Sequence, residues 1–415
     1  SFAEPFIANE PSAAAAEADA FLYNGLWSTY TEGVETARKL PAGSVMAMIN
    51  ELPQRLTAAG GEAAKLALAG KLGDGLKTRD ELREMMIERG AKDSEGKTFR
   101  QVSYEGYLAR QKPQLLGDAI GVVVAEGEIV DGPAPAGTVG GISTAELIRK
   151  ARDDKAIKAV VLRVNSPGGS VYGSEMIRRE LELTRAAGKP VVVSMGDVAA
   201  SGGYWISMAS DEVLADAGTI TGSIGVFALL PTADKALDKL GVHTAGTTTT
   251  WLGGVGDPRL PPNPRFNELL QIAINQIYSE FTGKAAQARK TTPDKIDAVA
   301  QGRVWTGAQA KERGLVDTLG GYRDALKAAA TRAKLPEDAR VVFIQPEPGR
   351  AERLLELLGG AAVQQLLAKV DLQIAPLGAP GRVLQEARQE LGWLAEMGEG
   401  RKPFTAITHC LCKEP

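Results

Sequence analysis

Short apolar stretches alternate with amphipathic ones over residues 119–216, and this alternation is the strongest constraint on the fold. The apolar stretches resemble buried strands, and the segments between them carry apolar residues at helical spacing. The predicted strands are residues 119–130, 156–164, 190–195 and 212–216, and the predicted helices are residues 143–154, 174–188 and a short one beginning near Ser201. Successive β-α-β units imply parallel strands joined by right-handed crossovers. The sequence therefore predicts an α/β fold built of repeated β-α-β units.

Two of the strand-to-helix junctions carry unusual residues. In the stretch NSPGGS, a predicted turn, Gly168 and Gly169 allow positive φ and can present backbone N–H groups to a close neighbour. In the stretch AASGG, Ser201 stands at a predicted helix N-terminus, where unpaired N–H groups and the helix dipole favour a developing negative charge. Together the junctions suggest a nucleophile, Ser201, beside an oxyanion hole formed by the N–H groups of Gly169 and Gly202.

A plainer interpretation is that small residues merely let these two turns pack closely. The chain has only two histidines, and both are far from Ser201 in sequence, so a Ser-His-Asp triad is disfavoured and a catalytic serine needs another base. We interpret Gly168 and Ser223, a second serine between glycines, as parts of the wall of the site. Tyr204 and Trp205, one helical turn after Ser201, are predicted to pack in the core.

The composition is that of a globular protein of two or three domains: 415 residues, 44% hydrophobic and 24% charged. A net charge of -3 argues against a nucleic-acid partner, and the longest apolar runs are too short to cross a bilayer. The only cysteines, Cys410 and Cys412, are too few for a disulfide framework. With His409 they form a possible but weak metal contact in a terminal tail, so we expect neither a metal nor another cofactor.

An internal repeat is visible when residues 24–39 are aligned with residues 275–290, at an offset of 251. The aligned aromatics and the final Ala-Arg-Lys agree. Farther on, residues 71–76 recur as residues 314–319 at an offset of 243. Two matches in the same order predict a tandem duplication.

The duplication predicts a division of the chain into three parts. Residues 1–115 form the closing part of the first copy plus a linker, residues 116–345 form the second copy with Ser201, and residues 346–415 form a helical extension and tail. Because the first copy has only its closing part, we expect its front part to precede Ser1.

Four stretches resemble the active-site signature of the signal peptide peptidase A family, in its tandem-repeat form. They are RVNSPGGSV (163–171), VVVSMGDVAASGGYWIS (191–207), TGSIGVF (221–227) and GRVWTGAQAKERGLVD (302–317). The resemblance implies the crotonase-like α/β fold shared with Clp protease, and a serine endopeptidase that degrades remnant signal peptides. It implies Ser201 as the nucleophile, with Gly169 and Gly202 donating to the oxyanion. It also implies a homotetramer at the bacterial inner membrane, its catalytic part facing the periplasm and its anchor upstream of Ser1.

The base that the resemblance implies is a lysine, and it is missing from the expected stretch. In single-copy relatives it lies in the segment that corresponds to residues 247–254, which contain no lysine. In the tandem form it comes from the first copy, just before a stretch that resembles the opening SFAEPF, so we expect it immediately before Ser1. Lys189, Lys235 and Lys239 are poor substitutes, because they fall at helix ends or on polar helical faces where lysine stays solvated and charged.

Two other functions stay open at this point. A crotonase-type acyl-CoA hydratase or isomerase would use the same N–H groups to hold a thioester enolate, although neither junction carries the glutamate which that chemistry usually needs. A catalytically inactive membrane scaffold would explain the missing lysine, but not a serine beside two oriented glycine turns.

Overall fold

The computed structural model describes residue 4, residues 8–108, 110, 116–244 and 246–346, and the backbone of residues 407–409. Two compact units make up the chain. The helical unit is Ala16–Gly117, and the sheet unit is Asp118–Pro415 together with Ser1–Ala15. The boundary between Gly117 and Asp118 lies two residues after the one predicted between residues 115 and 116. Apart from residue 346 and the backbone of residues 407–409, the predicted C-terminal extension lies outside the described residues.

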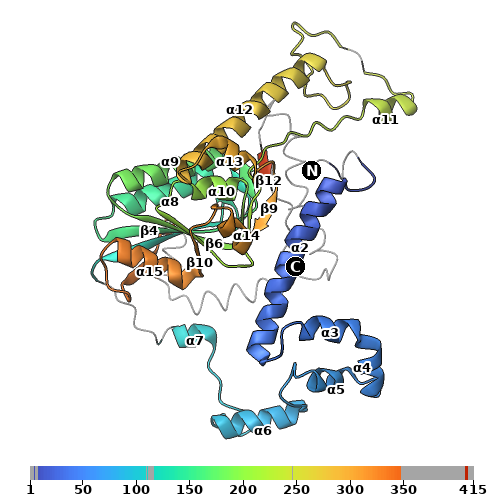
Figure 1. Cartoon of the computed structure of the whole chain (residues 1–415). Coiled ribbons are helices and arrows are strands. Elements are labelled where there is room, and N and C mark those ends of the chain that lie inside the picture. The colour runs from blue at the N-terminus through green and yellow to red at the C-terminus, as the bar shows by residue number, and fades with distance from the viewer. Residues whose placement is uncertain are drawn as a thin grey trace. The chain divides into compact units, whose positions relative to one another are not determined.

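The sheet unit is built on a mainly parallel sheet, as predicted (Figure 1). In the described part of the chain its strands are β1 (Ala119–Glu126), β4 (Ile157–Ser166), β6 (Val191–Ala200), β7 (Glu212–Ala215), β8 (Ile220–Gly222), β9 (Val304–Thr306), β10 (Thr318–Leu319) and β11 (Arg340–Phe343). The strands of the main path, β10-β7-β6-β4-β1-β11, are all parallel. β8 continues the sheet beside the end of β6 and pairs antiparallel with β9.

Helices cover both faces of this sheet. Successive side chains of β4 therefore lie in two different hydrophobic cores. On one face lie α8 (Gly141–Asp153), α9 (Val171–Ala186) and α10 (Gly202–Ser207), and on the other lies α15 (Tyr322–Arg332) (Figure 1). Val160 and Leu162 belong to the first core, whereas Val161 packs in the second one with alanines of α15. Burial on both faces is what a parallel sheet requires. The other helices that the structure describes between residues 118 and 346 are α11 (Asp234–Lys239), α12 (Pro264–Ala288), α13 (Pro293–Asp297) and α14 (Gly307–Glu312).

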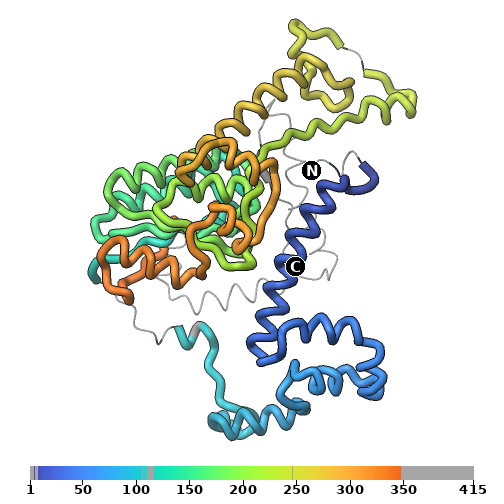
Figure 2. Tube along the Cα trace, viewed as in Figure 1, coloured from blue at the N-terminus to red at the C-terminus, as the bar shows by residue number. Residues whose placement is uncertain are grey.

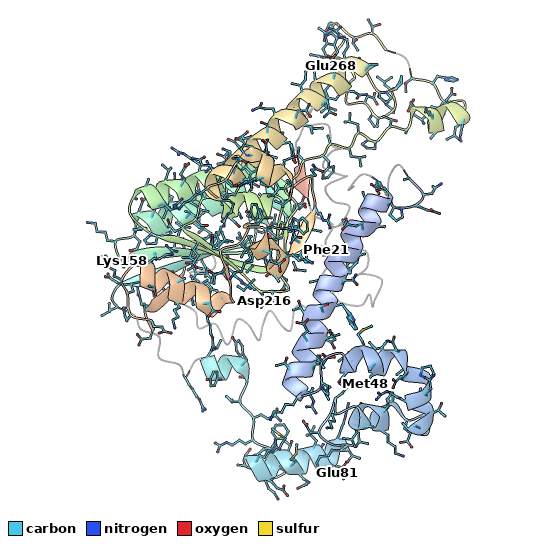
Figure 3. The ribbon with its side chains drawn as sticks, viewed as in Figure 1. Phe21, Met48, Glu81, Lys158, Asp216 and Glu268 are labelled. Carbon is cyan, nitrogen blue, oxygen red and sulfur yellow. The ribbon has the colours of Figure 1, made fainter. Side chains whose placement is uncertain are left out.

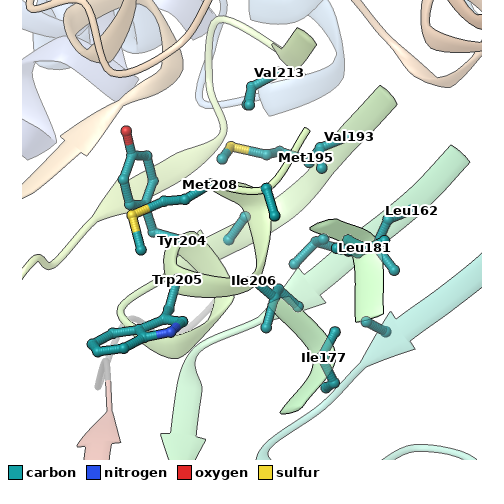
Figure 4. Close-up of a cluster of buried hydrophobic side chains, with 14 of the residues drawn as sticks. Leu162, Ile177, Leu181, Val193, Met195, Tyr204, Trp205, Ile206, Met208 and Val213 are labelled. Carbon is teal, nitrogen blue, oxygen red and sulfur yellow. The ribbon is translucent and has the colours of Figure 1, made fainter. Parts of the chain in front are cut away.

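The larger core gathers around the helix that follows Ser201 (Figure 4). Tyr204 and Trp205 are fully buried, so their predicted core role is confirmed. The indole of Trp205 lies 4.6 Å, centroid to centroid, from the ring of Phe281 on α12. The long helix α12 is thereby fastened to the core at its C-terminal half.

Three local predictions were wrong. The predicted strand 119–130 is broken at Gly127, whose φ of +93° and close approach to the carbonyl of Gly137 separate β1 from β2 (Ile129–Val130). The helix predicted from residue 143 begins at Gly141, and the Ser143 hydroxyl donates to the carbonyl of Gly140 instead of capping the helix.

The third concerns the predicted NSPGGS turn. There β4 runs on to Ser166, and residues 168–170 form a strand, β5 (Gly168–Ser170). A second, smaller sheet has the order β12-β5-β2-β3, with β3 (Val139–Gly140) and β12 (Ile407–His409).

The helical unit and the helix that leads into it repeat contacts of the sheet unit. The helices are α2 (Ala13–Arg38), α3 (Ser44–Asn50), α4 (Leu52–Ala58), α5 (Ala63–Ala69), α6 (Arg79–Arg89) and α7 (Tyr104–Leu108), and Figure 2 traces their path. The Thr31 hydroxyl donates to the carbonyls of Trp27 and Ser28, and the Thr282 hydroxyl donates to those of Tyr278 and Ser279.

An ion pair is also repeated at matched positions of the two copies. Arg38 pairs with Asp74 and Arg289 pairs with Asp317, each at 2.8 Å. These pairs of residues are separated by the same offsets, 251 and 243, as the sequence matches. The shared contacts support the predicted duplication.

The two matched helices differ in what covers them. Phe281 of α12 is 0% exposed, whereas its counterpart Tyr30 on α2 is 61% exposed. Trp27 and Phe21 on α2 are also exposed, and Figure 3 labels Phe21 among these side chains. The same helical sequence pattern therefore buries its aromatic face in one copy only, among the described residues.

Replacing Phe281 by alanine should destabilise the sheet unit by about 3–5 kcal/mol, because the change leaves a cavity against Trp205. Leu269→Ala on the same helix is the matched control, since Leu269 is exposed and its truncation should cost about 0.5 kcal/mol or less. Urea unfolding followed by near-ultraviolet circular dichroism measures both. Equal effects of the two changes would contradict this account of the core.

Candidate active site

Ser201 occupies a strained turn between β6 and α10. Its backbone has φ +55° and ψ -116°, and it is the N-cap of α10 without a side-chain capping hydrogen bond. A positive φ costs a non-glycine residue about 1–3 kcal/mol, and such strain persists only where the surroundings impose it. A strained strand-to-helix turn is also the setting of the nucleophilic serine in α/β-hydrolases. The predicted position of Ser201 at a helix start is confirmed, and its hydroxyl is not used to cap that helix.

Backbone hydrogen bonds hold this turn from both sides. The N–H of Ser201 donates to the carbonyl of Gly222 on β8 at 2.9 Å, and the carbonyl of Ser201 accepts from the N–H of Trp205 at 2.9 Å. The residue is only 1% exposed. The conformation of Ser201 therefore depends on the pairing of β8 with β6 and on the first turn of α10.

The two glycine junctions meet beside Ser201. A Cβ placed on Gly202 would lie 3.2 Å from the Cα of Gly168, 3.2 Å from the nitrogen of Gly169 and 2.7 Å from the Ser174 hydroxyl. Gly168 and Gly169 have φ of +109° and +143°, the positive values that the sequence predicts. The structure thus brings together Ser201, Gly202, Gly168 and Gly169, which lie on two different β-α connections.

The close approach of β5 to its neighbour explains why Gly169 has no side chain. Its Cβ would lie 2.2 Å from the carbonyl oxygen of Ile129, the residue opposite it on β2. Ser170, the next residue, accepts the N–H of Gly173 at the start of α9, and its hydroxyl donates to the carboxylate of Asp131. The peptide planes around Gly169 are therefore fixed by β2 on one side and by α9 on the other.

Ser223 stands next to the residue that holds the Ser201 amide. It follows Gly222, has φ +50°, and donates its N–H to the carbonyl of Arg303 at 2.8 Å. Ser223 therefore lies next to Gly222, whose carbonyl accepts the Ser201 N–H, and its role in the wall of the site stays a prediction.

An ion-pair cluster that the sequence did not reveal supports the turn from α9. The Trp205 indole N–H donates to the carboxylate of Glu175 at 2.8 Å, and Arg178 and Lys284 also donate to that carboxylate. Partial burial acts to raise the pKa of Glu175, but the hydrogen bonds from Arg178, Trp205 and Lys284 outweigh it and lower the pKa to about 2. Glu175 is therefore a carboxylate that fixes the indole directly behind Ser201.

Two lysines of the sheet unit, Lys284 and Lys189, bind groups other than Ser201. Lys284 pairs with Glu175 and Glu280, both at 3.1 Å, and so acts as a cation of this cluster. Lys189 donates to the carbonyls of Ala151 and Asp154. Burial lowers the pKa of Lys189, but this lysine precedes β6, whereas Ser201 follows its far end. Ten residues of strand separate them by about 30 Å.

The two other lysines weighed from the sequence lie in solvent. Lys235 and Lys239 are exposed residues of α11. None of the three lysines considered from sequence is thus placed as a base for Ser201.

Most of the residues of the possible metal contact lie outside the described residues. Within the described ranges no group of three or more His, Cys, Asp or Glu side chains is arranged to hold a metal ion. Cys410 and Cys412 lie outside those ranges, and only the backbone of His409 is described.

No helix in the described ranges combines the length and the apolar character needed to cross a membrane.

The comparisons with known proteins match this chain to peptidases. The model of peptidase family S49 matches residues 184–336. The chain is 40% identical to protease 4 of Salmonella typhi over 90% of its own length and 60% of that protein. It is 32% identical to protease 4 of Haemophilus influenzae, covering 98% of the chain and 66% of that protein. A putative protease of Synechocystis is 34% identical, over 53% of the chain and 78% of that protein. The chain thus spans about two thirds or less of the two protease 4 relatives.

Solved structures give distant matches. A variant of the 1510-N membrane-bound stomatin-specific protease is 13% identical, with a TM-score of 0.35, covering 56% of this chain and 100% of that one. A ClpP1 variant from Listeria monocytogenes is 15% identical, with a TM-score of 0.33, covering 50% of this chain and 94% of that one.

Glu175→Gln should destabilise the sheet unit by about 2 kcal/mol at pH 7, because the lowered pKa reports a stabilised carboxylate. A lowered folded-state pKa contributes stability above the unfolded value of 4.5 and loses it as the pH falls toward about 2. The difference between the two proteins should therefore shrink between pH 4.5 and pH 2. Urea unfolding at several pH values measures it.

Glu280→Gln is the matched control, because Glu280 pairs with the same lysine from an exposed position and should contribute about 0.5 kcal/mol or less. A Glu175→Gln effect that is the same at pH 7 and pH 3 would refute the ionic role of Glu175.

Proposed function

Because the chain belongs to peptidase family S49, we propose that it is a serine endopeptidase that cleaves apolar peptides, remnant signal peptides among them, through an acyl-enzyme at Ser201. The observation that carries the proposal is the backbone of Ser201. A serine held at φ +55° between a strand and a helix, without capping that helix, has a conformation that ordinary turn packing does not need.

The reaction would proceed in two steps. The Ser201 oxygen attacks the carbonyl carbon of the peptide bond, its proton passes to the base, and the carbonyl oxygen becomes an oxyanion. The C–N bond then breaks, and the leaving amine takes the proton from the base. Water, deprotonated by the same base, attacks the resulting ester, and Ser201 regains its proton as the acid product departs. Atoms and charges balance over the cycle.

The oxyanion would be stabilised by the N–H groups of Gly202 and Gly169. The contact between Gly202 and the Gly168–Gly169 backbone supports this assignment, since both donors stand next to Ser201 on segments fixed by other contacts. Preorganised backbone donors need no reorganisation when the charge develops. Gly168 and Ser223 would form the adjoining walls.

The base would be a lysine that precedes Ser1. A lysine accepts the serine proton only when it is neutral, which requires desolvation in an apolar pocket. Residues 247–254 contain no lysine. Lys284 pairs with carboxylates, Lys189 donates to carbonyls, and Lys235 and Lys239 are exposed. The protease 4 relatives, which are longer than this chain, are the kind of protein in which such a residue would lie.

The acyl-CoA hydratase or isomerase alternative is disfavoured by the structure of Glu175. That chemistry needs a glutamate free to move a proton at the α-carbon of the substrate. The Glu175 carboxylate is instead bound by Arg178, Lys284 and the Trp205 indole. A scaffold without catalytic activity stays the competing proposal, and the Ser201 variant below separates it from a peptidase.

The proposal extends to assembly and location. We place the protein at the bacterial inner membrane as a homotetramer, with the catalytic part facing the periplasm and an anchor upstream of Ser1. The resemblance of the signature residues to the signal peptide peptidase A family supports these assignments.

Hydrolysis of an apolar fluorogenic peptide tests the mechanism in the protein that carries both the expected upstream lysine and residues 1–415. Ser201→Ala should lower kcat by about 10⁴-fold or more, since the nucleophile is lost. Replacing the lysine before Ser1 by alanine should have a comparable effect. Survival of activity in the lysine variant would show that another residue is the base.

Ser223→Ala is the matched control, because Ser223 is a second positive-φ serine in the same region and is assigned no proton transfer. It should keep kcat within about tenfold of the parent protein. If Ser223→Ala abolishes hydrolysis and Ser201→Ala does not, the roles of the two serines are reversed. If none of the variants changes any measured function, the scaffold proposal is correct.

A further inference from the structure

The proposed reaction assigns no role to the side chains of residues 302–317, although this stretch is one of the four that resemble the family signature. The stretch forms β9 and α14 and leads to β10. Trp305, in the middle of β9, is 4% exposed. β9 pairs antiparallel with β8, and β8 pairs with the end of β6, directly before Ser201. Trp305 is therefore a buried aromatic residue one strand away from the candidate nucleophile's turn.

Trp305 packs on the residue that holds the Ser201 amide. A Cβ placed on Gly222 would lie 2.8 Å from Cδ1 of the Trp305 indole. Gly222 has φ +84°, and its carbonyl accepts the N–H of Ser201 at 2.9 Å. With this positive φ, and with the indole this close, a larger residue would force one of the two segments to shift. The indole thus bounds the peptide group to which Ser201 is hydrogen-bonded.

The ring of Trp305 is itself held by a hydrogen bond and by two cations. Its indole N–H donates to the carbonyl of Val299 at 2.9 Å. The guanidinium carbons of Arg303 and Arg313 lie over the ring, 4.5 Å and 4.0 Å from its centroid. Guanidinium groups stack on aromatic faces and are attracted by the electrons of the ring, most strongly for tryptophan. The hydrogen bond restricts rotation of the ring in its plane, and the guanidinium groups restrict its movement out of the plane.

The two arginines are anchored to elements that are fixed to one another. Arg303 directly precedes β9, and its carbonyl accepts the N–H of Ser223 at 2.8 Å. Arg313 is the C-cap of α14 and donates to the carbonyl of Gln309 at 2.9 Å. A capping box, in which Thr306 and Gln309 exchange hydrogen bonds, joins α14 to β9. β9 and α14 lie together in the sheet unit (Figure 1). The position of the indole relative to β8 is therefore set by a rigid strand-to-helix unit.

The turn of Ser201 needs such support because its backbone is strained. A serine at φ +55° returns to negative φ unless its neighbours prevent it. The hydrogen bond from the Ser201 N–H to the Gly222 carbonyl is one of the contacts that prevent it. A shift of that carbonyl would let Ser201 rotate, and would displace both its hydroxyl and the N–H of Gly202. A displacement of about 1 Å in a reacting group can lower a rate about 10²-fold.

We propose that Trp305 is a positioning residue of the site, whose ring, held by Arg303 and Arg313, keeps the Gly222 carbonyl in the place where it fixes Ser201 at positive φ. Trp305 acts through Gly222 and not on the substrate. This inference deepens the proposed function and rests on it for the effect on hydrolysis. The effect on the turn itself is measurable without hydrolysis.

Hydrogen exchange of the Ser201 amide, followed by mass spectrometry, tests the effect on the turn in the upstream-extended protein used for hydrolysis. Trp305→Phe removes the indole N–H and shortens the ring system, and Arg313→Gln removes one cation from its face. Each should speed exchange at Ser201 about tenfold, the ratio that corresponds to about 1.4 kcal/mol of lost contact. The amide of Val160 on β4, which donates to the carbonyl of Pro190 at 2.8 Å, should keep its rate.

Arg265→Gln is the matched control for the loss of a cation from an indole. The Arg265 guanidinium lies over the ring of Trp251, 4.3 Å from its centroid, at the first turn of α12. The control therefore removes the same type of contact from a different tryptophan. Exchange at Ser201 and at Val160 should both stay as in the parent protein.

Hydrolysis of the apolar fluorogenic peptide gives the second measurement. Trp305→Phe and Arg313→Gln should lower kcat about 10- to 100-fold and leave KM within about twofold, since a displaced nucleophile weakens the transition state and not the contacts of bound substrate. Arg265→Gln should keep both constants within about twofold. A higher KM at unchanged kcat would overturn the positioning role and would assign Trp305 to substrate binding.

The two measurements separate this inference from the proposed function. Unchanged exchange at Ser201 overturns the inference. Equal acceleration at Ser201 and Val160 also overturns it, since Trp305 would then serve only the stability of the whole unit. Faster exchange at Ser201 alone, in a parent protein that does not hydrolyse peptides, supports Trp305 as the support of the turn and rejects the peptidase proposal. Faster exchange at Ser201 alone, with unchanged kcat in an active parent protein, overturns the role of Trp305 in the reaction.

Discussion

The site depends on the close approach of two backbone segments at the end of β6. A Cβ on Gly202 would lie 3.2 Å from the backbone of both Gly168 and Gly169, and a Cβ on Gly169 would lie only 2.2 Å from the carbonyl oxygen of Ile129 on β2. This close approach sets the relative positions of two β-α connections. Ser201 lies between them, and its backbone has a positive φ. Side chains also stabilise the turn. The Trp205 indole N–H donates to the carboxylate of Glu175 behind it. The chemistry proposed for this protein therefore rests on backbone geometry.

Much of this arrangement could be predicted from the sequence, because parallel strands and glycine-rich junctions leave local signals. The apolar stretches predicted the main sheet, and the glycines predicted positive φ at Gly168 and Gly169. Three features had no local signal. The break at Gly127 arises from contact with Gly137, the strand β5 arises from pairing with β2, and the Glu175 cluster joins α9 to α10 and α12. Each depends on a tertiary neighbour, which periodicity cannot reveal.

The matched helices α2 and α12 show how much tertiary context adds to the same local pattern. Both carry a threonine that bonds back to the preceding turn and an arginine paired with a later aspartate. α12 lies against the core of the sheet unit, where Phe281 packs on Trp205 behind the turn of Ser201. Exposing a large aromatic surface such as that around Tyr30 to water costs free energy. Among the described residues, the same local pattern thus gives a buried aromatic face on α12 and an exposed one on α2.

A site made of backbone has a consequence for how it can be controlled. Its donors cannot be removed by rotating a side chain, because each N–H is fixed by the fold that surrounds it. Access can instead be changed by covering the strand that carries those donors, and an edge strand accepts any extended segment of suitable register. β5 is a short strand that pairs with β2 on one side and with β12 on the other, so both of its edges are covered.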